Sequence, residues 1–201
     1  LYNKMKLPEV KNPDDIIESI KIIKNSKLIE DYEKTMINFI SNGIVGIDGE
    51  IEELYLFHGT KEESLKSIIK NNFQLDSQPV NQHGDALQRR KAQVYGKGIY
   101  FSEYPSVGLN YGNALILCKV LIGKCQQMDI KDLNAKGDIL GGINSKKLNN
   151  SHDGYVYVIK ETAQILPVGI ITLKNKNIFN DIYKRHHPQT SVVSISVTNP
   201  Q

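Results

Sequence analysis

The order of the apolar segments constrains the fold of this chain more than any other feature of its sequence. Residues 12–40 carry apolar side chains at helical spacing, whereas the apolar runs after Gly49 are short, β-prone and joined by irregular polar loops. Strands that do not alternate regularly with helices form largely antiparallel sheets rather than doubly wound parallel ones. The sequence therefore predicts an α+β fold in which the helices come first.

Two helices are expected in the N-terminal part of the chain. The first follows a helix-start signal at residues 12–15 and is indicated by isoleucines at helical spacing, namely Ile16, Ile17, Ile20 and Ile23. The second is expected over residues 27–40 and ends before Asn42 and Gly43. Neither segment looks catalytic, so both are interpreted as packing elements.

Five segments after Gly49 are β-prone, namely residues 54–57, 95–102, 114–122, 155–159 and 170–173. Pro167 lies between the last two. After the first strand, His58 and Gly59 are expected to begin a turn, with Thr60 as the N-cap of a helix that ends near residue 72. Glu63 lies three residues after Thr60, which completes the pattern of a capping box. Residues 134–153 are expected to form a polar loop.

Composition limits the classes of function. The net charge of +3 comes from scattered lysines rather than from a basic block, so nucleic acid is not expected as a partner. The two cysteines, Cys118 and Cys125, are expected to be buried free thiols, and no spacing with the histidines resembles a metal site. No apolar run approaches the ~18 residues that span a bilayer, and no signal peptide is recognised. We therefore expect no metal, no membrane contact and an intracellular location, cytoplasmic or nuclear.

Three ordered blocks carry a candidate site. Leu56-Phe57-His58-Gly59-Thr60 is followed by Tyr95-Gly96-Lys97-Gly98-Ile99-Tyr100-Phe101-Ser102, and then by Asn110-Tyr111 ahead of an apolar strand. Two further blocks follow, Leu121-Ile122-Gly123-Lys124 and Val156-Tyr157-Val158-Ile159…Gln164…Pro167…Ile170-Ile171. Together the five blocks resemble the poly(ADP-ribose) polymerase family over about residues 16 to 173.

The resemblance implies an ADP-ribosyltransferase fold, a mostly antiparallel split β-sandwich with N-terminal helices. Residues 20–28 resemble the helix that precedes the catalytic core in the mono-ADP-ribosylating members. The expected organisation is a catalytic domain over residues 1–174, with a helical lead-in over 1–49, and a C-terminal extension over 175–201. The chain begins at Leu1, and we expect it to be a monomeric domain of a larger protein.

The resemblance also implies roles for individual residues. His58 matches the triad histidine that holds the nicotinamide ribose of NAD, and Gly59 matches the glycine whose backbone clamps the nicotinamide carboxamide. Thr60 stands where the family places a hydroxyl near the adenine-side ribose. Tyr100 matches the triad tyrosine beside the nicotinamide ring, and Tyr111 matches the tyrosine that stacks on it. Aromatic walls and backbone hydrogen bonds suit a reaction in which neutral nicotinamide leaves and positive charge develops on the ribose.

Two positions depart from the family pattern. The third triad position, counted back from Gln164, is Val156, where polymerising members carry a glutamate. Asp153 is not a substitute, because its odd offset along a strand turns it to the other face. Gly108 stands where the family has a serine that bonds the nicotinamide amide, and Ser106 is the nearby candidate to supply that hydroxyl.

The leading hypothesis is an NAD-dependent mono-ADP-ribosyltransferase, a glycosyltransferase of the pentosyl type. It is expected to act on protein side chains, its own included, with nucleic-acid ends as the alternative acceptor. One alternative is an inactive pseudo-transferase that serves as an NAD-sensing or interaction module. Another is the related RNA 2′-phosphotransferase, whose arginine-rich phosphate site has no clear counterpart here. Residues 76–93 form a long aperiodic stretch and are predicted to be a loop over the NAD site.

Overall fold

The computed structural model describes residues 17–45, 50–75, 94–112, 114–150 and 154–174. The predictions made for the loop over residues 76–93 and for the 175–201 extension concern residues outside these ranges. The positions of Ile16 and Asp153 also lie outside the described residues.

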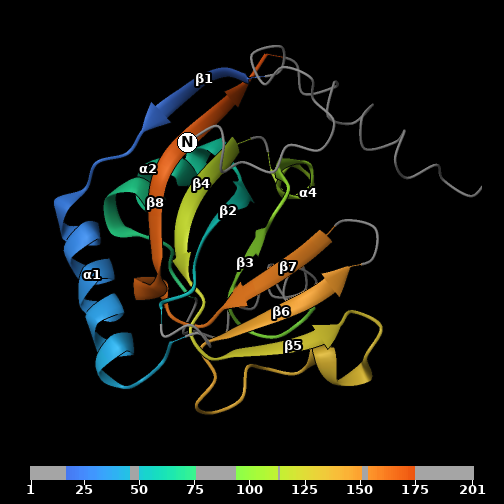
Figure 1. Cartoon of the computed structure of the whole chain (residues 1–201). Helices are drawn as coiled ribbons and strands as arrows, with labels where there is room; N and C mark the ends of the chain where they lie inside the picture. The colour runs from blue at the N-terminus through green and yellow to red at the C-terminus, as the bar shows by residue number, and fades with distance from the viewer. Residues whose placement is uncertain (1–16, 46–49, 76–93, 113, 151–153, 175–201) are drawn as a thin grey trace, which may run out of the picture.

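Eight strands form one sheet, in the order β1-β8-β4-β2-β3-β7-β6-β5 (Figure 1). All neighbouring strands are antiparallel except β5 and β6, which run parallel. The strands are β1 (Ile17–Ile22), β2 (Glu53–Thr60), β3 (Ile99–Ser102), β4 (Ala114–Leu121), β5 (Cys125–Asp129), β6 (Ser145–Asn150), β7 (Gly154–Ile159) and β8 (Ile165–Leu173). The predicted α+β fold with mostly antiparallel pairing is confirmed.

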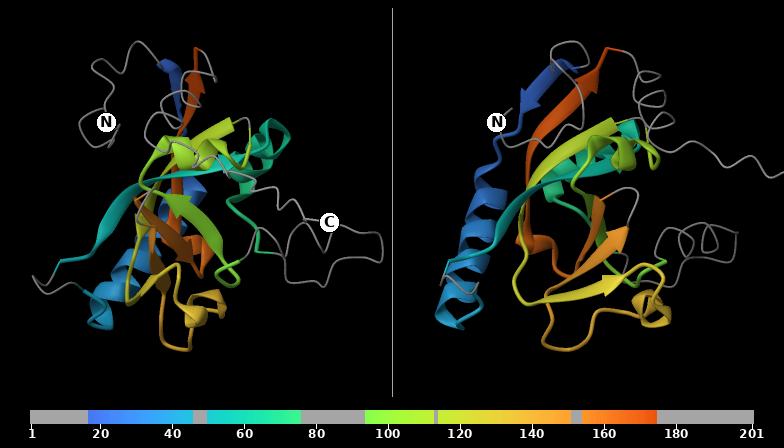
Figure 2. Two further views of the ribbon diagram at one scale, coloured as in Figure 1. Left: turned by 90° about the vertical axis from the view of Figure 1, so that its right-hand side faces the viewer. Right: turned by 45° about the vertical axis from the view of Figure 1, so that its right-hand side comes forward.

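The sheet is divided between β2 and β3. In the part of the chain that the structure describes, these strands are joined at one residue pair, Phe57 with Ser102. The two four-stranded halves therefore turn away from each other, as Figure 2 shows. Between them lies a central cluster that includes Leu56, Phe101 and Tyr157. The narrow junction matters for function because the candidate site residues gather around it.

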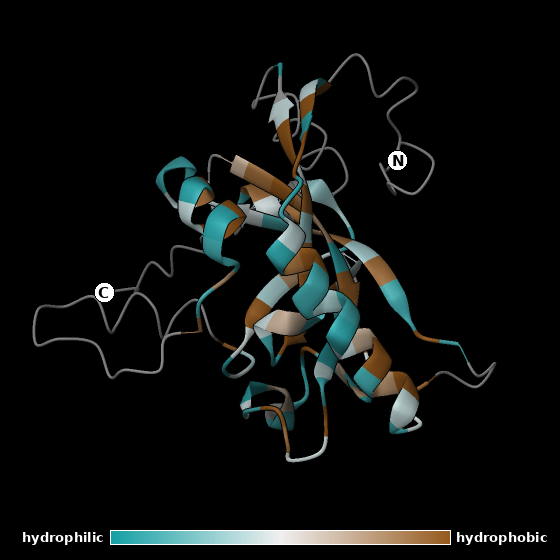
Figure 3. Cartoon of the chain, turned by 90° about the vertical axis from the view of Figure 1, so that its left-hand side faces the viewer, coloured by the Kyte–Doolittle hydropathy of each residue, from teal (hydrophilic) through white to brown (hydrophobic). Residues whose placement is uncertain are grey.

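The helices cover the sheet: α1 (Ser26–Ser41), α2 (Glu62–Asn71), α4 (Pro105–Leu109) and the short 3-10 helices η3 (Leu133–Lys136) and η4 (Thr162–Gln164). Leu28, Tyr32 and Phe39 of α1 pack against Leu121 of β4 and Leu166 of β8. The outer side of α1 carries both hydrophilic and hydrophobic residues (Figure 3). No helix in the described ranges is long and apolar enough to cross a membrane.

The prediction of a helix beginning at Ile16 is wrong. Residues 17–22 form β1, an edge strand paired with β8. A register shift between Ile17 and Ser19 inserts one extra residue, so Ile17 and Ile20 lie against the same apolar cluster although they are three residues apart. A β-bulge thus produced the spacing that suggested a helix. The second predicted helix, over residues 27–40, is confirmed as α1.

Other local predictions need correction. Thr60 is not an N-cap, because β2 continues through His58 and Gly59 and pairs Thr60 with Ala114. The cap position of α2 is Lys61, which makes no side-chain capping bond. The stretch predicted as a polar loop over residues 134–153 contains β6. Pro167 lies inside β8, where a register shift opposite residues 117 and 118 accommodates the missing N–H.

Candidate active site

A pocket of about 320 Å³ opens at the junction of the two half-sheets. It is lined by residues from the end of β2, from β3, from α4 and from β7. The sequence-predicted residues that line it are His58, Gly59, Thr60, Tyr100, Tyr111 and Val156. The fold therefore brings together residues that are up to 98 positions apart, from His58 to Val156 (156 − 58). The side chain of Ser106, on α4, is outside the described part of the structure.

The His58 ring, on β2, makes one hydrogen bond and two aromatic contacts. Its ring nitrogen Nδ1 lies 2.8 Å from the backbone carbonyl oxygen of Tyr100. The ring packs edge-on against Phe73, at 4.7 Å between centroids, and is tilted against Phe101 at 5.5 Å. Burial lowers the pKa of His58, while the hydrogen bond to Tyr100 opposes this shift. Since a carbonyl only accepts, Nδ1 carries the proton and the neutral ring leaves Nε2 as an acceptor.

Tyr100 is fixed through its hydroxyl. This hydroxyl donates to the carbonyl oxygen of Gly96 at 2.7 Å and accepts from the backbone N–H of Tyr95 at 2.9 Å. Burial raises the pKa of Tyr100, the Tyr95 hydrogen bond opposes the shift, and nearby Tyr111 adds to it. The phenol therefore remains neutral. Its ring orientation is set by a turn only four residues earlier in the chain.

Two glycines allow α4 to approach β2 closely. A Cβ placed on Gly59 would lie 1.6 Å from the carbonyl oxygen of Gly108, so only glycine fits at position 59. A Cβ placed on Gly108 would lie 2.9 Å from Leu115 Cδ1 and 3.2 Å from the backbone nitrogen of Gly59. Gly108 is not at positive φ. Backbone atoms thus form this wall of the pocket, which suits the recognition of a flat amide group.

Tyr111 and Thr60 form the outer part of the pocket. Tyr111 follows α4, and its backbone N–H donates to the carbonyl oxygen of Gly108 at 3.0 Å. Its side chain is 67% exposed, which leaves a ring face available to a ligand. Lys61, which sequence reasoning did not select, also lines the pocket. Lys61 directly follows the His58-Gly59-Thr60 block, and this position was the only feature of the sequence that indicated a place in the pocket.

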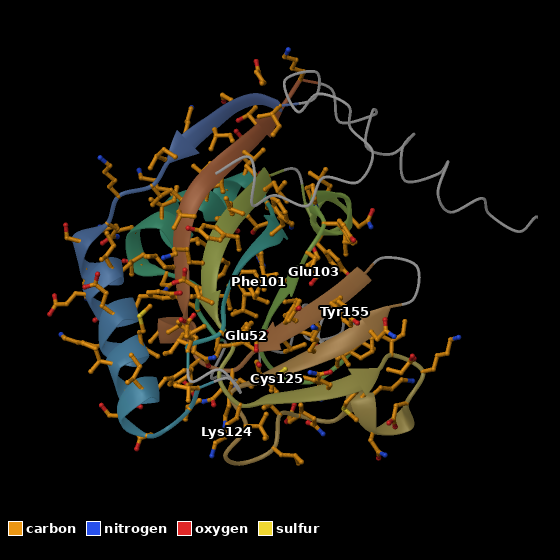
Figure 4. The ribbon with its side chains drawn as sticks, viewed as in Figure 1. Glu52, Phe101, Glu103, Lys124, Cys125 and Tyr155 are labelled. Carbon is orange, nitrogen blue, oxygen red and sulfur yellow. The ribbon has the colours of Figure 1, made fainter. Side chains whose placement is uncertain are left out.

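No carboxylate belongs to the described lining of the pocket. Val156 of β7 pairs with Ser102 of β3 and packs against the apolar cluster of the second half-sheet. Glu103 directly follows the lining residue Ser102, and its carboxylate accepts a hydrogen bond from the Tyr157 hydroxyl at 3.1 Å. Figure 4 labels Glu103 just beyond Phe101, in the space that faces Tyr155. Glu103 is therefore engaged elsewhere and does not replace the absent glutamate.

Both cysteines are free thiols, as expected, but the prediction that they are buried is confirmed only for Cys118. Cys118 is buried within β4, and burial raises the pKa of its thiol. Cys125 is half-buried and its pKa is also raised by burial. Within the described ranges, no group of three or more His, Cys, Asp or Glu side chains is placed to hold a metal ion.

Comparison with known proteins gives two findings. The family model described as the poly(ADP-ribose) polymerase catalytic domain matches residues 2–177. A curated protein of Caenorhabditis elegans, "Poly [ADP-ribose] polymerase tankyrase", is 31% identical over 85 residues. That similarity covers 37% of this chain and 3% of the relative, so the chain spans a small fraction of the length of the relative it matches.

Proposed function

Because the chain belongs to the poly(ADP-ribose) polymerase catalytic-domain family, we propose that its pocket binds NAD and transfers single ADP-ribose units to protein side chains. The bond between nicotinamide and ribose breaks, and its electron pair leaves with neutral nicotinamide. The acceptor oxygen then bonds to the ribose carbon. A carboxylate acceptor has no proton to lose, whereas a hydroxyl acceptor releases its proton to solvent. No metal enters this scheme, and we propose a cytoplasmic or nuclear setting.

The residues of the pocket support this assignment in distinct ways. Gly59 lines the pocket beside Gly108 and has no side chain to keep a carboxamide from its backbone, while Tyr100 and Tyr111 supply aromatic faces. The Nε2 acceptor of neutral His58 suits a ribose hydroxyl. Lys61 supplies a positive charge at the pocket, which suits the anionic pyrophosphate of NAD.

The transfer of single units rests on one observation, the absence of a carboxylate from the described lining of the pocket. Val156 neither stabilises a cationic ribose nor orients the hydroxyl that chain extension requires. An acceptor side chain that carries a carboxylate supplies the negative charge that Val156 lacks. The hydroxyl of an ADP-ribose already attached to the protein carries no such charge, so it is a poor acceptor for a second unit. The tankyrase relative is named as a poly(ADP-ribose) polymerase, so this proposal distinguishes the chain from that relative.

The test is incubation of the purified chain with labelled NAD and analysis of the labelled products by gel electrophoresis and mass spectrometry. We expect discrete adducts of one ADP-ribose unit on the chain or on an added acceptor. A ladder of polymer would overturn the proposed transfer of single units. NAD binding without labelling would favour the alternative of a pseudo-transferase, for which Val156 and Gly108 are the specific support.

A further inference from the structure

Among the described residues, Lys146 of β6 is the charged side chain that is fully buried, with 1% of its surface exposed. Its ammonium nitrogen lies 3.2 Å from the carbonyl oxygen of Tyr95, 3.1 Å from that of Ala135 and 2.5 Å from that of Gly137. An ammonium group has three N–H donors, and three carbonyls satisfy all of them. Burial of a charge is tolerated only with such partners. Lys146 therefore ties β6 to two other segments, the turn at Tyr95 and the end of η3.

One of these segments is the turn that holds Tyr100. The turn supplies both partners of the Tyr100 hydroxyl, the N–H of Tyr95 and the carbonyl of Gly96. Gly96 has φ +99, and a Cβ there would lie 2.5 Å from the carbonyl oxygen of Gly137. The turn thus packs directly on a second segment that Lys146 also holds. A continuous set of contacts runs from the ammonium of Lys146 to the hydroxyl of Tyr100.

We propose that Lys146 is a positioning residue for Tyr100, acting from outside the pocket by fixing the turn at residues 95–97. The proposal rests on the proposed function, because that function assigns Tyr100 to the NAD site. A purely structural role, satisfying the carbonyls at the end of η3, accounts for the contacts with Ala135 and Gly137. It does not account for the contact with Tyr95, which leads to the pocket.

The first experiment measures the turn without reference to activity. Amide hydrogen exchange at Tyr95 is compared in the wild type, Lys146→Met, Lys146→Gln and Tyr100→Phe. We expect exchange to be about tenfold faster in Lys146→Met and in Tyr100→Phe, because each removes one support of the turn. Lys146→Gln keeps only one amide group as donor and is expected to fall between the wild type and Lys146→Met.

Lys147→Met is the matched control. Lys147 is the next residue on β6 and faces the other way, with its ammonium 4.1 Å from the centre of the Tyr155 ring. Removing this charge is expected to leave the exchange of Tyr95 unchanged. Equal acceleration in the Lys147 and Lys146 variants would mean that general loosening of β6 is responsible, and would overturn the proposal.

The second experiment is a double-mutant cycle on NAD affinity. Lys146→Met is expected to weaken NAD binding about tenfold in the wild-type background, because a displaced Tyr100 ring loses part of its contact with the ligand. In the Tyr100→Phe background it is expected to add less than about a twofold loss, because the shared route is already broken. Equal losses in both backgrounds would show that Lys146 acts independently of Tyr100, and would overturn the proposal.

The two readouts separate failure of this proposal from failure of the proposed function. If the wild type does not bind NAD, the assignment of the pocket fails, yet the exchange of Tyr95 still reports whether Lys146 holds the turn. If Lys146→Met does not fold, Lys146→Gln carries both measurements. A folded Lys146 variant with wild-type Tyr95 exchange and wild-type NAD affinity would overturn the positioning role.

Discussion

The Nδ1 atom of His58 lies 2.8 Å from the backbone carbonyl oxygen of Tyr100, so two residues of the proposed site, on β2 and β3, are joined directly. The contact crosses the point where the two half-sheets are joined by the pair of Phe57 with Ser102. It fixes the proton on Nδ1 and leaves Nε2 of the neutral ring as a hydrogen-bond acceptor. The protonation state of His58 therefore connects the stability of the fold with the NAD binding that we propose.

Burial lowers the pKa of His58, so the folded chain holds the ring neutral where the unfolded chain, with a pKa of 6.5, begins to protonate. The stabilisation that the neutral His58 ring gives the folded state is fully present above pH 6.5. It declines as the pH falls from 6.5 through the lowered pKa of the folded state, because the unfolded state then binds more protons. We expect the wild type to lose more free energy of unfolding than His58→Gln over this window. Denaturant titrations at a series of pH values measure the difference, and parallel pH profiles would contradict it.

Truncation of the same side chain separates function from fold. We expect His58→Ala to abolish ADP-ribose transfer, because the acceptor for the ribose hydroxyl and the link to Tyr100 are both lost. The ring also packs on Phe73 and Phe101, so a loss of stability of about 1–3 kcal/mol accompanies the change. Circular dichroism and the labelled-NAD assay measure the two effects. A folded variant that keeps most of its activity would show that the site is misplaced.

Gly59→Ala tests the contact between β2 and α4. Its Cβ would meet the carbonyl oxygen of Gly108 at 1.6 Å, and backbone must move to relieve the clash. We expect a loss of about 3 kcal/mol or more, together with the loss of NAD binding. Gly141→Ala is the matched control, because no atom lies within 4 Å of the Cβ position there. Thermal unfolding of both variants measures the difference, and similar midpoints would contradict the close contact.

Gly108→Ser adds the hydroxyl that the family pattern has at this position. Gly108 is not at positive φ, and the closest contact of the new Cβ is the movable end of Leu115, at 2.9 Å. We therefore expect a folded protein that binds NAD a few-fold more tightly, as about 1 kcal/mol from one hydrogen bond implies. Isothermal titration with NAD measures the change.

The control for that variant is Gly108→Ala, which adds the same Cβ without a hydroxyl. We expect it to bind NAD no more tightly than the wild type, so that the gain in the serine variant is assigned to the hydrogen bond. Equal affinities of the serine and alanine variants would mean that a hydroxyl at position 108 does not reach the ligand.

The order and type of the local motifs were determined by the sequence alone. The His58-Gly59-Thr60 block, the segment around Tyr100 and the valine at position 156 were recognisable through the resemblance to the family, because together they follow the order of its motifs. The antiparallel α+β class followed from the lack of alternation between helices and strands. The helix predicted over residues 27–40 forms over residues 26–41, because the hydrogen bonds of a helix join residues close in sequence and its apolar residues follow the helical period.

Only the tertiary structure decided features that depend on pairing between distant segments. Ile17 and Ile20 are three residues apart, a spacing that suggests a helix, but pairing with β8 makes the segment a strand, and the bulge in β1 places both side chains on one face. Thr60 continues β2 because β4 offers hydrogen bonds that outweigh a helix cap. Lys146 looked like one surface lysine among many, yet carbonyls from two distant segments enclose it. Such contacts join residues many positions apart, and no local sequence pattern contains the geometry that brings them together.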